Sequence, residues 1–189
     1  MAQFYLIRHG ETDWNRKGLY TGQSDIPLNN NGRMQAQQTA TDLQKLQPSI
    51  IYSSDLQRAV ETAQIISQTL HVPIFLDNRL REIHQGEWEG LHEMEIKTRF
   101  EEEFRSRLED PLSVAPPGGE TIGDVLVRVS GAVKDMLKQH PTKKITVVAH
   151  GVVLAMMILI AKEIPVSRVF EFVPKNAIIT HVDIERIND

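Results

Sequence analysis

Cysteine is absent from this 189-residue chain, which excludes disulfide bonds, thiolate metal sites and cysteine nucleophiles. An excess of basic charge is also lacking. The formal net charge is -4, so the chain as a whole is not suited to bind nucleic acid or an anionic membrane. Any anion-binding site must therefore be a local cluster of basic groups. A chain without cysteine suits a reducing compartment, and we expect a cytoplasmic protein.

Long apolar runs are missing as well. The longest, from Val152 to Ala161, is too short to span a bilayer. Met1 leads directly into a predicted strand, so we expect no signal peptide. The chain also lacks internal repeats and low-complexity tracts. With 41% hydrophobic residues it can bury an ordinary core, and its length predicts a single domain over residues 1–189.

Strand-like and helix-like segments alternate along the chain. Several strand-like segments are rich in Ile and Val without alternation, as strands buried on both faces are. The predicted strands are Phe4–Ile7, Ser49–Tyr52, Ile74–Leu76, Lys144–Ala149 and Ala177–Ile184. The predicted helices are Gly32–Leu46, Asp55–Leu70, Thr121–Gln139 and Val152–Lys162. This order predicts an α/β fold of three layers, in which helices flank a mainly parallel sheet.

Residues 88–115 interrupt this alternation. The segment is polar, charged and helical in pattern, which is also typical of a surface helix that only faces water. It lies, however, between two motifs that carry candidate catalytic residues. We therefore predict that it forms a small helical cap over the carboxyl edge of the sheet.

Two histidines share one context in the sequence. His9 and His150 each end a predicted strand, and each is followed by a glycine. Ligands of parallel α/β sheets bind beyond the carboxyl ends of the strands, so both histidines should lie at one edge. The helix that begins near Gly151 aims its first N–H groups at this edge, which favours an anion. We expect Gly10 to let the chain turn without crowding that anion.

Three charged residues are expected at the same edge. Arg8 precedes the first histidine, Arg58 lies in the first turn of a predicted helix, and Glu82 follows the third predicted strand. Each of them alone has a purely structural explanation; Arg58, for example, could pair with Glu61 or Asp55 on its own helix. Together with two histidines at strand ends, the set is much harder to attribute to chance.

Two arginines and two histidines around one point suit a small dianion, above all a phosphoryl group. Arginine keeps its charge and offers a planar fork of donors. Neighbouring arginines should lower the pKa of His9, and a neutral imidazole can attack phosphorus to form a phosphohistidine. Glu82 is a candidate general acid for the departing oxygen. Because the arginines take the electrostatic role of a metal, we expect no metal and no cofactor.

The stretch "LIRHGETDWN", residues 6–15, resembles the Arg-His-Gly signature of the histidine phosphatase superfamily, in its phosphoglycerate mutase-like branch. The resemblance continues in order to about residue 155, through "GLYTGQSDIPLNNNGRMQA", "IYSSDLQRAVETA", "LREIHQGEWEGL", "PPGGET" and "VVAHGVVL". It implies a phosphoglycerate mutase-like fold, His9 as the phosphorylated nucleophile and Glu82 as the proton donor. The phosphate pocket that it implies consists of Arg8, Arg58 and His150.

Further substrate-binding positions are weaker. Asn15 and Gln23 match phosphate-contacting positions of the family, although Asn and Gln in Gly-containing loops often serve only as turn formers. Gly151 joins the predicted substrate-binding set through the helix N-terminus that it opens.

The family contains both mutases and phosphatases. Cofactor-dependent mutases that resemble this chain are longer between the acid and the second histidine. The "LREIHQGEWEGL" motif looks more like the phosphatase branch, which includes broad-specificity and α-ribazole phosphatases. We therefore predict metal-independent hydrolysis of a small phosphorylated metabolite, with a 2,3-bisphosphoglycerate-dependent phosphoglycerate mutase as the alternative. A phosphate-binding protein without catalysis is disfavoured, because the nucleophile and the acid are both present. The apolar C-terminal strand region is a candidate edge for a homodimer.

Overall fold

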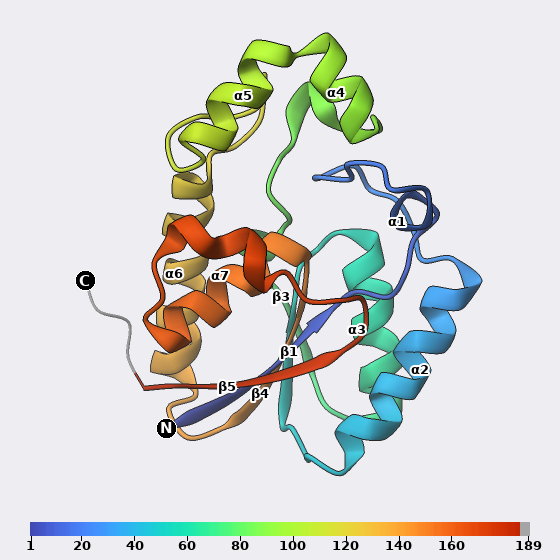
Figure 1. Cartoon of the computed structure of the whole chain (residues 1–189). Coiled ribbons are helices and arrows are strands. Elements are labelled where there is room, and N and C mark those ends of the chain that lie inside the picture. The colour runs from blue at the N-terminus through green and yellow to red at the C-terminus, as the bar shows by residue number, and fades with distance from the viewer. Residues whose placement is uncertain (186–189) are drawn as a thin grey trace.

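The computed structural model describes residues 1–185 and contains a five-stranded sheet of order β3-β2-β4-β1-β5 (Figure 1). The strands are β1 (Ala2–Arg8), β2 (Ile50–Ser53), β3 (Ile74–Leu76), β4 (Lys144–Ala149) and β5 (Ile179–Ile184). The pairs β1–β4, β2–β4 and β2–β3 are parallel, whereas β5 runs antiparallel to β1. The predicted α/β fold with a mainly parallel sheet is confirmed.

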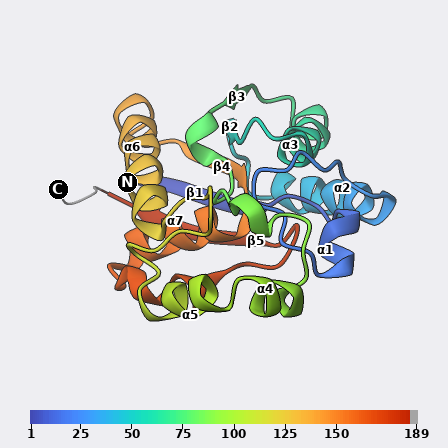
Figure 2. The ribbon, with the colours of Figure 1, turned by 90° about the horizontal axis from the view of Figure 1, so that it is seen from above.

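Two layers of helices flank the sheet. They are α2 (Asn30–Gln44), α3 (Gln57–Leu70), α6 (Ile122–Gln139) and α7 (Gly151–Lys162). Figure 2 shows α2 and α3 on one side of the sheet and α6 and α7 on the other. Because side chains alternate across a strand, β1 supplies both layers. Phe4 and Leu6 join the core cluster under α6 and α7, while Tyr5 and Ile7 join the cluster under α2 and α3. Burial on both faces explains the unbroken apolar run in the sequence.

The remaining described elements are α1 (Asp13–Lys17), η1 (Asn78–Leu80), η2 (Gly86–Trp88), α4 (Glu93–Arg99), α5 (Glu101–Glu109) and η3 (Val166–Phe172). Helices α4 and α5 belong to residues 88–115, the cap segment, and stand apart from the sheet (Figure 1). Within residues 1–185 no helix is both long enough and apolar enough to cross a membrane.

The start of α3 differs from the prediction. The sequence predicts that this helix begins at Asp55, but α3 begins at Gln57 and has no side-chain cap. Tertiary partners bind the side chains that precede it. Ser54 Oγ lies 2.8 Å from His150 Nε2, and the Asp55 carboxylate lies 2.6 Å from Arg81. The segment between β2 and α3 is therefore held by the site and by an ion pair rather than by a helix cap.

Candidate active site

His9 lies where β1 ends. Its backbone N–H donates to the Ala149 carbonyl of β4 (3.0 Å), and its side chain is only 3% exposed. The Nδ1 atom lies 2.7 Å from the carbonyl oxygen of Gly10. Because that oxygen can only accept a hydrogen bond, Nδ1 carries the proton and Nε2 keeps a lone pair. Burial, followed by the charges of Arg58 and Arg8, holds the pKa of His9 well below its usual value, so its imidazole is neutral.

Gly10 is required by close packing against α2. A Cβ at this position would lie 2.3 Å from the carbonyl oxygen of Gly32, at the start of that helix. This contact requires a glycine here, and the expected room for an anion stays a prediction. The Gly10 N–H donates to Thr62 Oγ1 (3.1 Å), whose hydroxyl donates to the Arg58 carbonyl (2.8 Å). The loop after β1 is thereby linked to the first turn of α3.

His150 directly follows β4, immediately before α7, and is fully buried. Its Nδ1 accepts a hydrogen bond from Arg58 Nε (3.2 Å), and its Nε2 lies 2.8 Å from Ser54 Oγ. Because a guanidinium can only donate, Nδ1 is unprotonated and Nε2 carries the proton. Burial, followed by the charge of Arg58, lowers the pKa of His150 well below its usual value. The rings of His9 and His150 lie 5.1 Å apart between centroids, so the two predicted histidines meet as a neutral pair.

Arg58 joins three parts of the site. It is fully buried, and besides its bond to His150 it donates to the carbonyls of Ser24 and Gly22, at 2.7 Å each. Burial lowers the pKa of Arg58 to about 10, with the carboxylate of Glu82 opposing the shift, so the group is charged at neutral pH. Arg58 therefore ties the loop after α1 to the end of β4.

The structural alternative for Arg58 is wrong. Neither Glu61, on the same helix, nor Asp55, which precedes the helix, pairs with it; each binds another arginine. Glu61 accepts from Arg33 Nε (2.6 Å), and Asp55 accepts from Arg81 Nη2 (2.6 Å). The orientation of Arg58 is instead set by backbone carbonyls and by a histidine of a neighbouring strand.

Arg8 and Glu82 lie on either side of Gly151. A Cβ at Gly151 would lie 3.6 Å from Arg8 Cζ and 3.4 Å from Glu82 Oε2. Arg8 Nη1 donates to the Pro174 carbonyl (3.1 Å), while its buried Nε has no hydrogen-bond partner within the described residues. Burial lowers the pKa of Arg8, and the charge of Glu82 opposes the shift. The guanidinium therefore keeps one buried donor that no described residue satisfies.

The carboxylate of Glu82 is held by backbone donors. It accepts from the N–H of Ile83 (3.0 Å) and from the N–H of Val152 (3.2 Å to Oε1 and 3.3 Å to Oε2). The sequence predicts that the start of α7 faces an anion. In the structure, an N–H group of its first turn faces the side chain of Glu82.

The sequence did not predict the hydrogen bonds that hold the backbone at Glu82. Arg128, on α6, donates from Nη1 to the carbonyls of Arg79 (2.7 Å) and Arg81 (2.6 Å), and from Nη2 to the carbonyl of Glu82 (3.1 Å). The carboxylate of Glu120 fixes Arg128 in turn, with Nε at 2.9 Å. One guanidinium thus binds three backbone carbonyls within residues 79–82, so the backbone at Glu82 is anchored to α6. The spacing of charged residues in the sequence does not indicate that an arginine will bind backbone carbonyls so far away along the chain.

Gln23 and Asn15, the weaker candidates, are linked to the backbone of candidate catalytic residues, directly for Gln23 and through Asn176 for Asn15. Gln23 donates from Nε2 to the Glu82 carbonyl (3.1 Å), so its amide nitrogen faces the chain of Glu82. Asn15 Oδ1 accepts from Asn176 Nδ2 (3.3 Å), which also donates to the His9 carbonyl (2.8 Å). Their contact with phosphate stays a prediction.

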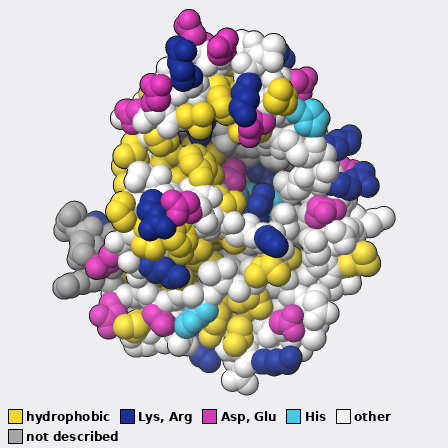
Figure 3. Space-filling model, viewed as in Figure 1, with side chains coloured by type: hydrophobic (Ala, Val, Ile, Leu, Met, Phe, Trp, Pro, Cys, Tyr) yellow, Lys and Arg dark blue, Asp and Glu magenta, His cyan; other side chains and the backbone are white. Residues whose placement is uncertain are grey.

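A cavity of about 440 Å³ lies beneath the cap segment and is called the cap pocket below. Its lining residues are Tyr20, Gln85, Trp88, Glu93, Lys97, Phe104, Arg107, Leu108, Pro111, Ser167 and Phe170. Figure 3 shows a hollow between the cap and the body of the molecule, with hydrophobic side chains gathered along one side. Trp88 is 1% exposed and is therefore packed in the interior.

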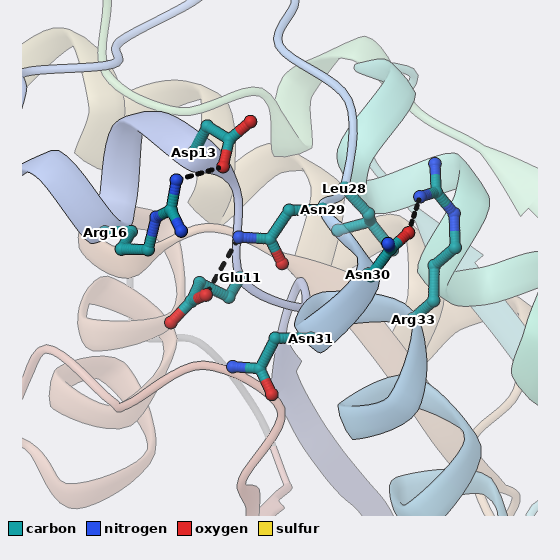
Figure 4. A pocket seen from close by; sticks show the side chains of 8 residues that line it. All are labelled: Glu11, Asp13, Arg16, Leu28, Asn29, Asn30, Asn31 and Arg33. Atoms are coloured by element: carbon teal, nitrogen blue, oxygen red, sulfur yellow. Dashed lines mark hydrogen bonds and ion pairs between the residues drawn. The ribbon is translucent and has the colours of Figure 1, made fainter.

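A second hollow, of about 700 Å³, lies between α1 and the start of α2 (Figure 4). Its lining residues are Glu11, Asp13, Arg16, Leu28, Asn29, Asn30, Asn31 and Arg33. Its polar side chains bond largely to one another, as in the Asp13–Arg16 pair at 3.2 Å and the Asn29–Glu11 bond at 2.8 Å. None of the predicted site residues lines it. Within residues 1–185 no cluster of three or more His, Asp or Glu is placed to hold a metal ion.

Comparisons with known proteins agree on one family. The model of the histidine phosphatase superfamily (branch 1) matches residues 4–188. Phosphoserine phosphatase 1 of Hydrogenobacter thermophilus is 32% identical over 177 residues, which are 94% of this chain and 84% of the relative. A probable phosphoglycerate mutase of Enterobacter sp. is 35% identical over 184 residues, 97% of this chain and 85% of the relative. The crystal structure of the α-ribazole phosphatase from Shigella flexneri superposes with a TM-score of 0.88 at 27% identity, covering 96% of this chain and 90% of the other.

Proposed function

Because this chain belongs to the histidine phosphatase superfamily, we propose that it hydrolyses phosphomonoesters through a phosphohistidine formed on His9. The observation that carries the proposal is the state of the His9 ring. Its Nδ1 donates to the Gly10 carbonyl, which leaves the Nε2 lone pair free to attack, and its pKa is lowered by burial and by Arg58 and Arg8. A neutral, oriented imidazole beside two guanidinium groups suits nucleophilic attack on a phosphoryl dianion.

The reaction has two steps. In the first, His9 Nε2 attacks phosphorus and the bond to the alcohol oxygen breaks, while the carboxyl of Glu82 gives its proton to that oxygen. Arg8 and Arg58 stabilise the charge on the equatorial oxygens. In the second, water attacks phosphorus and gives a proton to the carboxylate of Glu82. The phosphorus–nitrogen bond breaks, which releases phosphate and restores His9.

The backbone contacts of Glu82 support its place in this scheme. Its carboxyl group is fixed by the N–H groups of Ile83 and Val152, and its carbonyl is fixed by Arg128 and Gln23. A proton donor must be held within hydrogen-bond reach of the departing oxygen, and this anchoring holds the group beside Gly151. No step of the proposal requires a metal, because the guanidinium groups supply the positive charge.

The mutase alternative is supported by the probable phosphoglycerate mutase among the relatives. A mutase would keep the dephosphorylated alcohol in place and return the phosphoryl group to another oxygen. The compact interval between Glu82 and His150 favours hydrolysis. The chain would then act as one domain with residues 88–115 as its cap. A cytoplasmic location also stays a prediction, as does a homodimer through β5, an edge strand of the described sheet.

One assay series separates these functions. A phosphomonoester panel that includes phosphoglycerates, phosphoserine and α-ribazole phosphate is run with EDTA, beside a mutase assay with added 2,3-bisphosphoglycerate. We expect release of inorganic phosphate that EDTA does not change, and no interconversion of phosphoglycerates. Interconversion without net phosphate release would establish the mutase instead. Loss of hydrolysis in EDTA, restored by a divalent metal, would contradict the metal-independent mechanism.

A further inference from the structure

The cap pocket combines an apolar wall with one buried arginine. We propose that it binds the alcohol part of the substrate, and that this alcohol carries an apolar body and an anionic group bound by Arg107. This inference rests on the proposed function and adds a substrate class to it. It also assigns a specificity-determining residue within the cap segment.

Arg107 is a buried charge without a matching acid. Arg107 is 6% exposed, and its guanidinium carbon lies 5.2 Å from the ring centre of Trp88. Its Nη1 donates a hydrogen bond to Gln85 Oε1 (3.1 Å). Among residues 1–185 no carboxylate lies within ion-pair distance of it. Burial lowers the pKa of Arg107 to about 10, so the group is still charged at neutral pH. A buried charge is costly unless it is paired, and a ligand anion would supply the missing partner.

The half-buried Arg128 provides a contrast. Arg128 is paired with Glu120 and donates to three carbonyls, so its bonding capacity is largely met. Arg107 has neutral partners only, an amide oxygen and the face of an aromatic ring. Because Arg107 also lines the cap pocket, its unmet donors are available to a molecule inside it.

The walls of the cap pocket suit an apolar body. Trp88 packs against Phe104 with ring centroids 5.7 Å apart, and Tyr20 meets Trp88 edge-on at 6.2 Å. Phe170, from η3, lines the pocket and is 52% exposed. The volume of about 440 Å³ lies in the usual range for small-molecule sites. The lining also contains one acidic residue, Glu93, and a second basic residue, Lys97, which form an ion pair with each other, so their charges largely cancel.

The cap pocket shares two loops with the candidate phosphoryl site, which consists of Arg8, His9, Arg58, Glu82 and His150. Tyr20 belongs to the loop whose next residues, Gly22 and Ser24, accept hydrogen bonds from Arg58. Gln85 follows shortly after Glu82 in the other loop, and the carboxylate of Glu89 accepts N–H groups from both loops. The residues that line the cap pocket do not include the candidate catalytic residues themselves. The two regions are neighbours through these shared loops, and the proposal places the leaving alcohol of a phosphomonoester at His9 in the cap pocket.

A matched pair of aryl phosphates tests the inference. The first substrate is 3-(4-phosphonooxyphenyl)propanoate, and the second is its neutral propanamide, which has the same leaving phenol and nearly the same size. We expect the wild type to prefer the carboxylate in kcat/KM. In Arg107→Leu this preference should fall at least about ten-fold, mainly through KM, because a hydrogen-bonded charge contact is lost. Arg107→Lys should retain part of it.

Arg99→Leu is the matched control. Arg99 is also a cap arginine over an aromatic ring, with its guanidinium carbon 5.4 Å from the centre of Phe100, but it is exposed and lies outside the cap pocket. Its removal should leave the substrate preference within about two-fold of the wild type. Circular dichroism of each variant checks that the fold is retained.

Binding of the alcohol product separates a failure of this inference from a failure of the proposed function. Calorimetry measures the affinity of 3-(4-hydroxyphenyl)propanoate for the wild type and for Arg107→Leu. Arg107-dependent binding without hydrolysis of any phosphomonoester would support the subsite and overturn the hydrolase. Hydrolysis with no preference for the carboxylate in the wild type would overturn the subsite alone, and this result needs no folded variant.

Discussion

The phosphoryl site and the cap pocket each contain a buried arginine, but the two arginines are used differently. Arg58 makes hydrogen bonds to two backbone carbonyls and to His150, so its position is set before any substrate arrives. Arg107 donates to a single amide oxygen and lies over Trp88. A group that must bind the same phosphoryl oxygens in every substrate gains from fixed geometry, because electrostatic catalysis depends on preorganised charge.

The contrast also separates catalysis from selection. The phosphoryl site is framed by strand ends and helix starts of the sheet, whereas the cap pocket is lined largely by the cap segment and η3. Changes in the first should affect all substrates. Changes in the second should affect substrates according to their alcohol. The predictions below test this division.

The largest effect is expected for His9→Ala. Removal of the nucleophile should lower kcat at least about 10⁴-fold for every phosphomonoester, since loss of an attacking group disables the covalent route. Steady-state phosphate release measures this. The control is His181→Ala, a histidine on the exposed side of β5. Substantial turnover by His9→Ala, whatever the alcohol, would remove His9 from the mechanism.

Arg58→Lys should have a smaller effect and lower kcat/KM about 100-fold. The decrease should be the same for substrates with different leaving alcohols. Lysine keeps the charge but cannot reach His150 and both carbonyls of the loop at once. Arg33→Lys is the control, because Arg33 pairs with Glu61 at the half-exposed surface. A loss for Arg58→Lys that depends strongly on the alcohol would break the proposed division between the two regions.

Arg128→Leu should act through Glu82 and should change activity by about 10-fold. Freeing the carbonyls of the Glu82 segment misplaces the proton donor, so alkyl phosphates should lose more than 4-nitrophenyl phosphate, whose leaving group needs no proton. Glu82→Gln should give the same pattern more strongly. Arg79→Gln, which removes an arginine paired with Asp77 and Asp135, is the control. Equal losses for both leaving groups would mean that Arg128 only supports the fold.

The smallest effect concerns stability against pH. His9 and His150 are buried with their pKa values well below 6.5, so the unfolded chain binds more protons once the pH falls below about 6.5. Stability is therefore full above that pH and is lost as the pH falls toward the folded-state pKa values. Each histidine should contribute about 1 kcal/mol by pH 5.5. Urea unfolding of wild type and His9→Gln measures this, and an unchanged pH slope in the variant would contradict neutral burial of His9.

The sequence predicts the phosphoryl site because its residues occupy recognisable chain positions. His9 and His150 each directly follow a strand and precede a glycine, and Arg58 lies in the first turn of α3. In a parallel sheet these positions converge at one edge, so local pattern and topology together suffice. The first residue of α3 is harder to predict, because Ser54, which precedes the helix, contacts His150 instead of capping the helix.

The supports of the site could not be read from the sequence. Arg128 reaches carbonyls of residues 79, 81 and 82, and backbone carbonyls have no sequence signature. The stacking of Arg107 on Trp88 depends on how α5 folds back over η2, and the spacing of the two residues is not that of a helix face. Long-range polar contacts of this kind depend on the folded geometry alone.

Chemical trapping on the enzyme is the most direct test of the phosphohistidine. Wild-type protein is mixed with a ³²P-labelled phosphomonoester, quenched in alkali, digested and mapped by mass spectrometry. The mechanism predicts an acid-labile, alkali-stable phosphoryl group on the peptide that contains His9, attached at Nε2, and no label in His9→Ala. Turnover of the same substrate with label on another residue, or with no covalent label at any quench time, would contradict the assignment of His9 as the nucleophile.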